Sequence, residues 1–289
     1  SMDLPETDLF EYIQSNQDLS TFGQILVSTG YDSVISASQT FTVWAPTNNA
    51  LSGIDIQDAE LVAEIVQNHI ARGNHSTSGI VSKPVRMLNG KNVTFAREDQ
   101  GYSFGKMDLL NANNITLNGQ VHTIGGWVPY TNNIYEFIGR QEGLDSLEDY
   151  IYGQNQWVFD PANSPEIGFD SLGNVIYDSV YNFANPVLSQ LGYLDDEDSL
   201  YTAILPDNEG WTEAYERIRL YYNVPDVYGG AGRQHEKTRF AIVQDMVFRG
   251  LIDDPASYSI LVSTNGNDFY SPAYLFSGAR SFELSNGMA

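Results

Sequence analysis

Apolar residues near the start of the chain recur every three or four positions, the spacing of amphipathic helices. This spacing predicts helices over residues 7–15 and 18–29, and Gly30 follows the second as a helix stop. A third amphipathic helix is predicted over residues 59–71. Between the second and third helices, the apolar run at residues 41–45 predicts a strand.

The pattern then changes from a helical to a strand-like period. Residues 79–128 contain short apolar runs separated by turn residues, and Asn118-Gly119 is typical of a tight hairpin. Residues 134–138 predict a short closing segment. Helices followed by several strands predict a domain of the α+β class.

Three blocks of this pattern occur twice in the same order, which indicates two copies of one domain. The matched blocks are 42–51 (TVWAPTNNAL) with 202–211 (TAILPDNEGW), 65–73 with 242–250, and Asn118-Gly119 with Asn286-Gly287. The second copy has 17 more residues between the first two blocks (177 − 160) and 9 fewer between the last two (177 − 168). The domains are therefore predicted as 3–141 and 142–289, with insertions near 153–177 and 222–238.

The blocks of the first copy resemble the two motifs of the fasciclin-type domain. TVWAPTNNAL at 42–51 is similar to the first motif, and LNGQVHTIGGWVP at 117–129 is similar to the second. A tyrosine-histidine pair often lies between the motifs in this family, and here it reads Asn68-His69. The resemblance covers residues 6–139, and the second copy resembles the family more distantly.

This resemblance implies two tandem fasciclin-type domains of the α+β class, each a wedge-shaped β-sandwich flanked by helices. The second domain is expected to be divergent and C-terminally incomplete, with its last strand missing and a sheet edge exposed. The resemblance also implies cell adhesion through matrix proteins, receptors or glycans. We expect no integrin-type function, because the tyrosine of the pair is absent, but Asn68 and His69 remain candidate ligand-binding residues.

The charge of the chain excludes several classes of partner. The 289 residues carry 14 Lys+Arg and 37 Asp+Glu, a formal net charge of −23, and no basic run. We therefore expect no binding to nucleic acid and no adsorption to an anionic membrane surface. With 4 Trp, 18 Tyr and 14 Phe the chain is too aromatic for an acidic disordered chain.

Catalytic and cofactor-binding patterns are missing from the sequence, so we expect the protein not to be an enzyme and to need no cofactor. No nucleophile elbow, phosphate loop, dinucleotide fingerprint or helical histidine pair is present in the sequence. The absence of cysteine excludes disulfides and thiolate metal sites. The acidic runs 195–198 and 207–209 carry oxygen ligands suited to calcium but lack the calcium-loop pattern, so we interpret them as solvated loops.

The insertions of the second copy hold the remaining candidates. Trp157 and Phe159 lie in the first insertion, and Tyr228 and His235 lie in the second. Loops on a rigid scaffold commonly carry recognition, and aromatic rings pack against proteins and sugars alike. We therefore weigh three functions: non-enzymatic adhesion or ligand binding, a glycan-binding module of a polysaccharide-capture system, and a structural spacer.

The expected location is extracellular or at a cell surface. The sequence has no apolar stretch of about 18 residues, so no transmembrane helix is predicted. The divergent tandem copies resemble bacterial surface lipoproteins of this family, which implies attachment to the outer membrane through an N-terminal anchor. The expected partner is a protein or glycan outside the cell.

Overall fold

The structure, a computed structural model, describes residues 5–289. Internal contacts divide the chain into two compact units, Ser1–Thr131 and Asn132–Ala289. The sequence pattern predicts this boundary at 141/142, and helix α5 (Ile134–Arg140) explains the difference. Ile134 and Ile138 pack in the core of the second unit, so this segment opens the second unit instead of closing the first.

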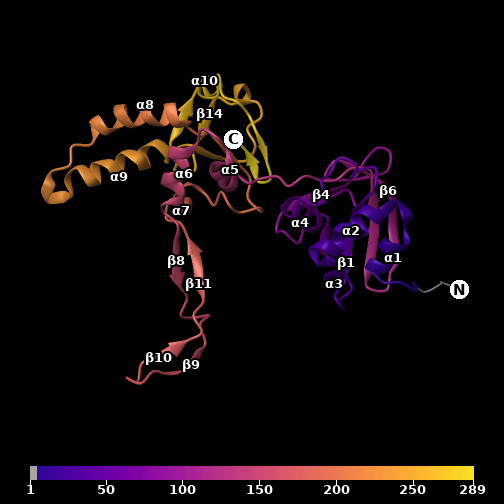
Figure 1. Ribbon diagram of the computed structural model, residues 1–289. Coiled ribbons are helices and arrows are strands. Elements are labelled where there is room, and N and C mark those ends of the chain that lie inside the picture. Colours follow the sequence, from indigo (N-terminus) through magenta and orange to yellow (C-terminus); the bar gives the residue numbers. More distant parts are fainter. Residues whose placement is uncertain (1–4) are drawn as a thin grey trace. The chain divides into compact units, whose positions relative to one another are not determined.

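The first unit is a curled, barrel-like sheet of seven strands with helices packed on it (Figure 1). The strand order is β2-β1-β7-β6-β5-β4-β3, in which β1 and β7 are parallel and the other neighbouring pairs are antiparallel. A bridge between Ala71 and Met87 ties one edge of the sheet back toward the other. The elements are α1 (Leu9–Ser15), the 3-10 helix η1 (Gln17–Leu19), α2 (Ser20–Thr29), α3 (Tyr31–Ile35), β1 (Phe41–Pro46), α4 (Ala59–Asn68), β2 (Ile70–Arg72), β3 (Ser82–Arg86), β4 (Asn92–Arg97), β5 (Tyr102–Phe104), β6 (Met107–Thr116) and β7 (Gly119–Ile124).

Two apolar clusters fill the first unit. One lies between the helices and the sheet and includes Phe22, Ile65 and Val43. The other surrounds Trp44, which is fully buried and stacks on Phe104 with ring centroids 4.3 Å apart. The helices and the strand β1 predicted from apolar spacing are confirmed, except that α4 ends earlier because β2 begins at residue 70.

The second unit has a smaller sheet of four strands and longer appendages. The strand order is β13-β12-β17-β16, with β12 and β17 parallel. The elements are α5, α6 (Asp145–Tyr152), β8 (Gln156–Phe159), β9 (Glu166–Phe169), β10 (Val175–Tyr177), β11 (Tyr181–Ala184), α7 (Leu188–Leu191), β12 (Tyr201–Ala203), α8 (Asn208–Ile218), the 3-10 helices η2 (Arg219–Tyr221) and η3 (Asp226–Tyr228), α9 (Gly230–Val243), β13 (Val247–Arg249), η4 (Pro255–Ser257), β14 (Ile260–Val262), β15 (Asp268–Tyr270), α10 (Pro272–Leu275), β16 (Glu283–Leu284) and β17 (Gly287–Met288).

The two units share a hydrogen-bonded frame around one threonine each. Thr42 Oγ1 donates to the carbonyl of Gly73 at 2.8 Å, and Thr202 Oγ1 donates to the carbonyl of Gly250 at 2.8 Å. Each hydroxyl also accepts a backbone N–H two residues after that glycine, at 2.9 Å in both units. The same buried side chain therefore fixes the same corner in both units.

An asparagine-glycine pair closes each unit in the same way. The Oδ1 atoms of Asn118 and Asn286 accept the first-helix N–H groups of Leu9 (3.0 Å) and Ile134 (2.9 Å). A Cβ on the next residue, Gly119 or Gly287, would overlap the carbonyl oxygen of the parallel strand beside it. Only glycine fits there, so the Asn-Gly repeat found in the sequence is a structural requirement.

The main differences between the units lie in two insertions. The 17 extra residues enlarge the segment between β12 and β13 into the hairpin of α8 and α9. A second insertion lies between α6 and α7 and reaches beyond the predicted 153–177 to Ala184. The second unit also has a strand at the position of the one expected to be missing, because β17 pairs with β12 as β7 pairs with β1.

Candidate functional site

Between α6 and α7 the chain forms a protruding arm, here defined as residues 156–184. Strands β8 and β11 form its proximal antiparallel ribbon, and β9 and β10 form its distal ribbon. Figure 1 shows the arm extending from the end of α6 and returning to α7. The first unit has no counterpart of this segment between α2 and α3, which follow each other directly.

One face of the proximal ribbon is aromatic. Trp157 lies opposite Phe183, and Phe159 lies opposite Tyr181, so all four side chains share a face. The ring centroids of each pair are 5.7 Å apart, and Tyr177 lies 5.6 Å from Phe159. Trp157 is 70% exposed and Tyr181 is 53% exposed. The arm therefore presents aromatic surface to solvent, although such side chains usually mark cores or interfaces.

This aromatic line continues into the body of the second unit. Phe183 lies 6.4 Å from Tyr135 in an edge-to-face arrangement, and Tyr135 stacks on Tyr152 at 4.4 Å. The Tyr152 hydroxyl donates to the Tyr135 carbonyl at 2.9 Å. Burial raises the pKa of Tyr152 to about 12, so this hydroxyl keeps its proton at neutral pH. The base of the arm is therefore fixed to α5 and α6.

Asn185 joins the two ends of the arm. Its Nδ2 donates to the Asn155 side chain and to the carbonyl of Ile151, both at 2.8 Å. Its Oδ1 accepts the backbone N–H groups of Val187 and Leu188, both at 3.0 Å. The arm therefore leaves and re-enters the unit at one point.

Asp160 fixes the bend between the two ribbons. Its carboxylate accepts the backbone N–H groups of Ala162 and Asn163 and the side-chain amides of Asn163 and Asn182. These hydrogen bonds lower the pKa of the Asp160 carboxyl, and those from the two side-chain amides have the largest effect. The bend is thus held by an ionised side chain at neutral pH.

Asp170 fixes the distal turn in a similar way. Its carboxylate accepts the Asn174 side-chain amide and the backbone N–H groups of Asn174 and Leu172, all at 2.8 Å. These hydrogen bonds, chiefly the one from the Asn174 amide, lower the pKa of the Asp170 carboxyl. The turn displays Leu172, which is 86% exposed, beyond the exposed side chains of Phe169 and Ile167. Both turns are ordered by their own side chains, so the arm presents a defined surface.

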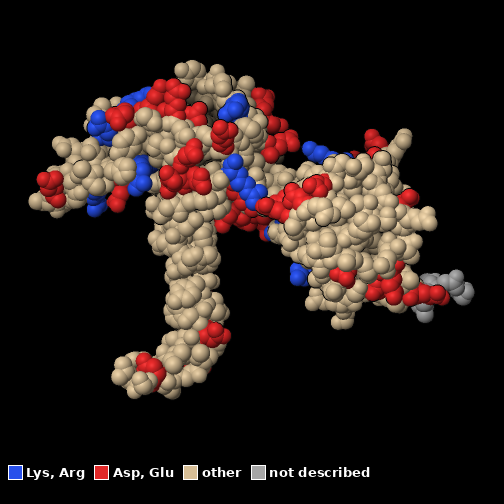
Figure 2. All heavy atoms as spheres, in the orientation of Figure 1, with Lys and Arg blue, Asp and Glu red and all other residues tan. Residues whose placement is uncertain are grey.

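The arm carries no positive charge. The chain has no lysine or arginine between Arg140 and Arg217, whereas the arm has four acids: Asp160, Glu166, Asp170 and Asp178. Figure 2 shows acidic but no basic atoms along the arm on the visible face. Its exposed surface is thus a mixture of aromatic, aliphatic, amide and acidic groups.

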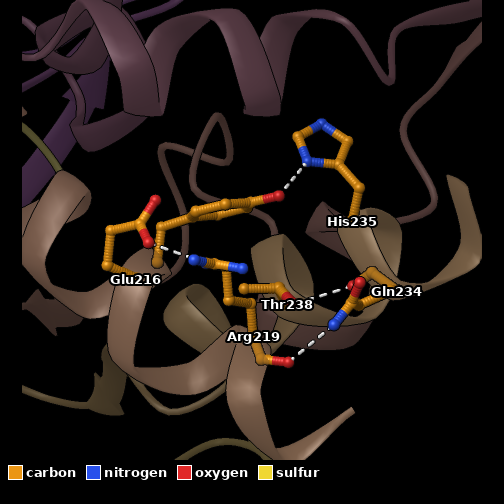
Figure 3. A network of polar contacts seen from close by, with 6 residues as sticks. Glu216, Arg219, Gln234, His235 and Thr238 are labelled. Carbon is orange, nitrogen blue, oxygen red and sulfur yellow. Dashed lines mark hydrogen bonds and ion pairs between the residues drawn. The ribbon is translucent and has the colours of Figure 1, made fainter. Parts of the chain in front are cut away.

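The other two candidates from the insertions lie on the α8–α9 hairpin. Tyr228 is 70% exposed at the end of the hairpin. His235 lies on α9, and its Nδ1 is 2.7 Å from the hydroxyl of Tyr215 on α8 (Figure 3). In the same network Gln234 Nε2 donates to the Arg219 carbonyl at 2.9 Å. His235 therefore joins the two helices.

Asn68 and His69 do not form a ligand-binding surface. Their exposed fractions are 2% and 0%, and both tie the end of α4 to a later segment of the first unit. His69 Nδ1 donates to the Ile65 carbonyl at 2.6 Å, and its Nε2 accepts the Val128 N–H at 2.9 Å. Burial lowers the pKa of His69 to about 4. The ligand-binding hypothesis for this pair is corrected: their role is structural.

The acidic runs serve as caps and corners. Asp207 accepts the N–H of Gly210 as the N-cap of α8, and Asp196 accepts the Ser199 hydroxyl at 2.6 Å. Within residues 5–289 no group of three or more histidines and acids is arranged to hold a metal ion. In the same range no helix has both the length and the apolarity to cross a bilayer.

The sequence found part of this site. It identified Trp157 and Phe159, which the structure brings together, but ended the insertion before Tyr181 and Phe183. The missed strand shows the same signal, because aromatic residues alternate with other residues in both β8 and β11. The exposed Leu172 carries no signal of its own in the sequence.

Comparison with known proteins places one domain of the chain. A family model for the fasciclin domain matches residues 17–126. A protein of Synechocystis, sll1483, is 24% identical over 125 residues, which cover 40% of this chain and 69% of that protein. The fasciclin-like arabinogalactan protein 14 of Arabidopsis thaliana is 30% identical over 119 residues, covering 40% of this chain and 44% of that protein.

One solved structure is similar over almost the whole chain. It is a pair of FAS1 domains from the insect cell adhesion molecule fasciclin I, with 13% identity, coverage of 94% of each chain and a TM-score of 0.34. The second unit itself repeats the hydrogen-bonded frame of the first unit.

Proposed function

Because residues 17–126 form a fasciclin domain and the second unit repeats its frame, we propose that this chain is an adhesion or ligand-binding protein without enzymatic activity. Fasciclin domains are generally involved in cell adhesion or ligand binding. We further propose that the arm is the contact surface and that its partner is a protein outside the cell. The observation that carries this proposal is the exposed aromatic face of a side-chain-ordered arm.

Stability does not explain the arm. A two-stranded ribbon is at best marginally stable in water and is usually covered when it carries aromatic side chains. Here the aromatic face extends away from the core clusters of the second unit, and Trp157 and Phe183 belong to none of them. A structural spacer would bury such residues, so their exposure supports a binding function.

The ring geometry favours a protein partner over an extended glycan. The ring pairs Trp157–Phe183, Phe159–Tyr181 and Phe159–Tyr177 meet at 67°, 61° and 65°. Rings at these angles make a ridged surface, which suits packing against protein side chains. A glycan platform would present its rings in one plane. The glycan-binding alternative retains one supporting observation, the free face of Trp157.

We test this proposal with the labelled full chain on an array of extracellular proteins and glycans. The arm variant replaces residues 156–184 with two glycines, because the side chains of Asn155 and Asn185 lie 2.8 Å apart and mark adjacent ends. The point variant is Trp157→Ala/Phe183→Ala. The matched control is Leu110→Ala/Ile115→Ala, which removes side chains of the first unit that are 62% and 69% exposed.

Selective protein signal that disappears in both arm variants and persists in the control is the expected result. Selective glycan signal lost in the same variants would establish the glycan alternative. Binding that survives arm deletion would refute the arm as the contact surface. Circular dichroism of each variant excludes loss of folding as the cause.

We propose that the protein is located at a cell surface. More specifically, we propose that it is attached to a bacterial outer membrane as a lipoprotein. This specific form is supported by the likeness of tandem divergent copies to bacterial surface lipoproteins. Protease treatment of intact cells producing the natural protein provides the test. Digestion of the exposed arm in intact cells is expected, whereas complete protection would contradict surface display.

A further inference from the structure

The α8–α9 hairpin ends in exposed apolar side chains that the proposed function of the arm does not use. We define the hairpin tip as Leu220, Tyr221, Val227 and Tyr228, which are 72%, 80%, 84% and 70% exposed. These residues lie in and beside η2 and η3, the two short turns that join the helices. The tip therefore gathers aliphatic and tyrosine side chains at the far end of a protrusion.

Positive charge gathers next to this tip. Residues 217–239 hold five of the 14 Lys+Arg of the chain: Arg217, Arg219, Arg233, Lys237 and Arg239. The same segment has two acids, Asp226 and Glu236, so its formal charge is 5 − 2 = +3. Counted over both helices, residues 208–243, three further acids of α8 bring the hairpin to 5 − 5 = 0, against −23 for the rest of the chain. Figure 2 shows basic atoms over α8 and α9 with acidic atoms beside them, whereas the visible arm has acidic atoms alone. The hairpin is a local exception to a strongly acidic protein.

Not every cation of this segment is available to a partner. Arg219 pairs with Glu216 at 2.7 Å, Arg239 lies over the Tyr150 ring, and Lys237 lies 5.7 Å from the Tyr222 ring. Arg217 and Arg233 lie at exposed positions on the two helices, on the body side of the tip. The acid within the tip, Asp226, has its carboxylate against the start of α9, where a helix favours negative charge.

From these observations we infer that the hairpin tip inserts into the interface of an anionic lipid bilayer, with Arg217 and Arg233 contacting its headgroups. Tyrosine rings suit the membrane–water interface, and aliphatic residues beside them supply apolar area for insertion. Basic residues near the surface are attracted by anionic lipids. The tip protrudes from the unit, and a protruding apolar tip can enter the surface of a bilayer without needing a pocket of matching shape.

This inference departs from the expectation, drawn from the net charge of −23, that the chain does not adsorb to an anionic membrane. The contact is local, and the acidic remainder of the protein lies too far from the tip to prevent it. With a rise of 1.5 Å per residue, the 14 residues of α9 span about 21 Å. The Debye length at physiological ionic strength is about 8 Å. The tip therefore meets the bilayer beyond the range at which the acidic body of the second unit repels it strongly.

The hairpin is rigid enough to transmit such a contact. The Tyr215–His235 and Gln234–Arg219 hydrogen bonds join its helices on the body side of the tip (Figure 3). Thr238, buried on α9, donates to the Gln234 carbonyl at 2.7 Å and so continues the network along α9. Because the helices are held together, insertion costs little ordering of the chain.

Vesicle flotation with the full chain tests the inference. The probes are vesicles of phosphatidylcholine alone and vesicles with an equal part of phosphatidylglycerol. The tip variant is Leu220→Asp/Val227→Asp, the headgroup variant is Arg217→Gln/Arg233→Gln, and the matched control is Ile167→Asp/Leu172→Asp in the arm, where both side chains are also exposed.

We expect binding to the anionic vesicles only, lowered by about ten-fold or more in the tip variant and several-fold in the headgroup variant. Binding of the unaltered protein falls as salt is raised, and the arm control binds normally. Absence of binding to anionic vesicles would overturn the inference, as would equal loss in the arm control. Both results leave the protein-partner proposal for the arm intact.

A probe at one position gives an independent readout. The chain has no cysteine, so Val227→Cys and Leu172→Cys each create a unique attachment site for an environment-sensitive dye. A blue shift with anionic vesicles at position 227, and none at 172, is expected. Equal shifts at both positions would indicate unspecific adsorption and would contradict insertion of the tip.

Discussion

The two units share one frame but present different surfaces. In the first unit the tryptophan of the repeated strand, Trp44, is fully buried between aromatic rings. In the second unit Trp157 is 70% exposed on an arm that the first unit lacks. The comparison teaches that the frame supplies the fold, whereas binding surfaces arise in segments inserted between its elements.

The largest expected effect concerns the glycines that close the frame. Gly119→Ala would push a Cβ into the carbonyl oxygen of Phe41, and Gly287→Ala would do the same at Tyr201. We expect each to destabilise its own unit by about 3 kcal/mol or more, because a strand must shift. Hydrogen exchange read by mass spectrometry reports each unit separately.

Gly53→Ala is the matched control for this prediction, because a Cβ there has open space and an ordinary φ. It is expected to leave hydrogen exchange unchanged. If Gly119→Ala and Gly287→Ala behave like the control, the close approach of each glycine to its neighbouring strand does not stabilise its unit as described.

A second prediction separates the units by pH. His69 and His122 of the first unit are buried, and burial lowers the pKa of each to about 4, from an ordinary value of about 6.5. The unfolded state therefore binds more protons between these values, so stability is full above about pH 6.5 and falls toward pH 4. Each histidine contributes up to about 3 kcal/mol to this loss.

The second unit has Met246 in place of His69, and its histidine, His235, is exposed. Between pH 7 and pH 4 we therefore expect exchange protection to fall in the first unit more than in the second. A His122→Gln variant, with a smaller pH dependence in the first unit, provides the check. Parallel loss in both units would contradict the assignment.

A third prediction tests whether the two threonine corners are equivalent. Thr42→Val and Thr202→Val keep the side-chain shape but remove a donor and an acceptor that each make one hydrogen bond. We expect a loss of about 1–3 kcal/mol in the unit that carries the change, since a buried N–H and a carbonyl lose their partners. Denaturant unfolding of the two variants measures it. A loss in one unit only would show that the corners are not equivalent.

The smallest expected effect concerns the arm. Trp157→Ala should change the free energy of unfolding by about 0.5 kcal/mol or less, because the side chain is mostly exposed. Trp44→Ala should cost about 3–5 kcal/mol. Denaturant unfolding of both tryptophan variants under the same conditions compares the loss of stability in the frame with that in the arm. A large effect at Trp157 would give the arm a structural role.

The repeated frame was predictable because its requirements are local and strict. Thr42 and Thr202 stand in matching motifs, and the Asn-Gly pairs repeat because no other residue than glycine fits beside the parallel strand. The arm was less predictable. Its strands pair only with each other, so β11 has no apolar face toward a core to mark where the insertion ends.

The boundary between the units was misplaced for a similar reason. Ile134 and Ile138 suit a closing segment of one unit or an opening helix of the next, and the pattern alone does not choose. The choice depends on Asn286, far along the chain, which accepts the N–H of Ile134. Asn68 and His69 were binding candidates only through the family resemblance, and both are buried.

The Asn-Gly closure also sets the order in which the protein can be completed during synthesis. The hydrogen bond between Leu9 and Asn118 joins residues 109 apart, and that between Ile134 and Asn286 joins residues 152 apart. Neither unit can close until its last strand has emerged, so the first unit finishes while the second is still being made. The arm and hairpin lengthen the second loop, yet closure entropy grows only with the logarithm of loop length. Long appendages therefore delay the second unit in time while costing it little in stability.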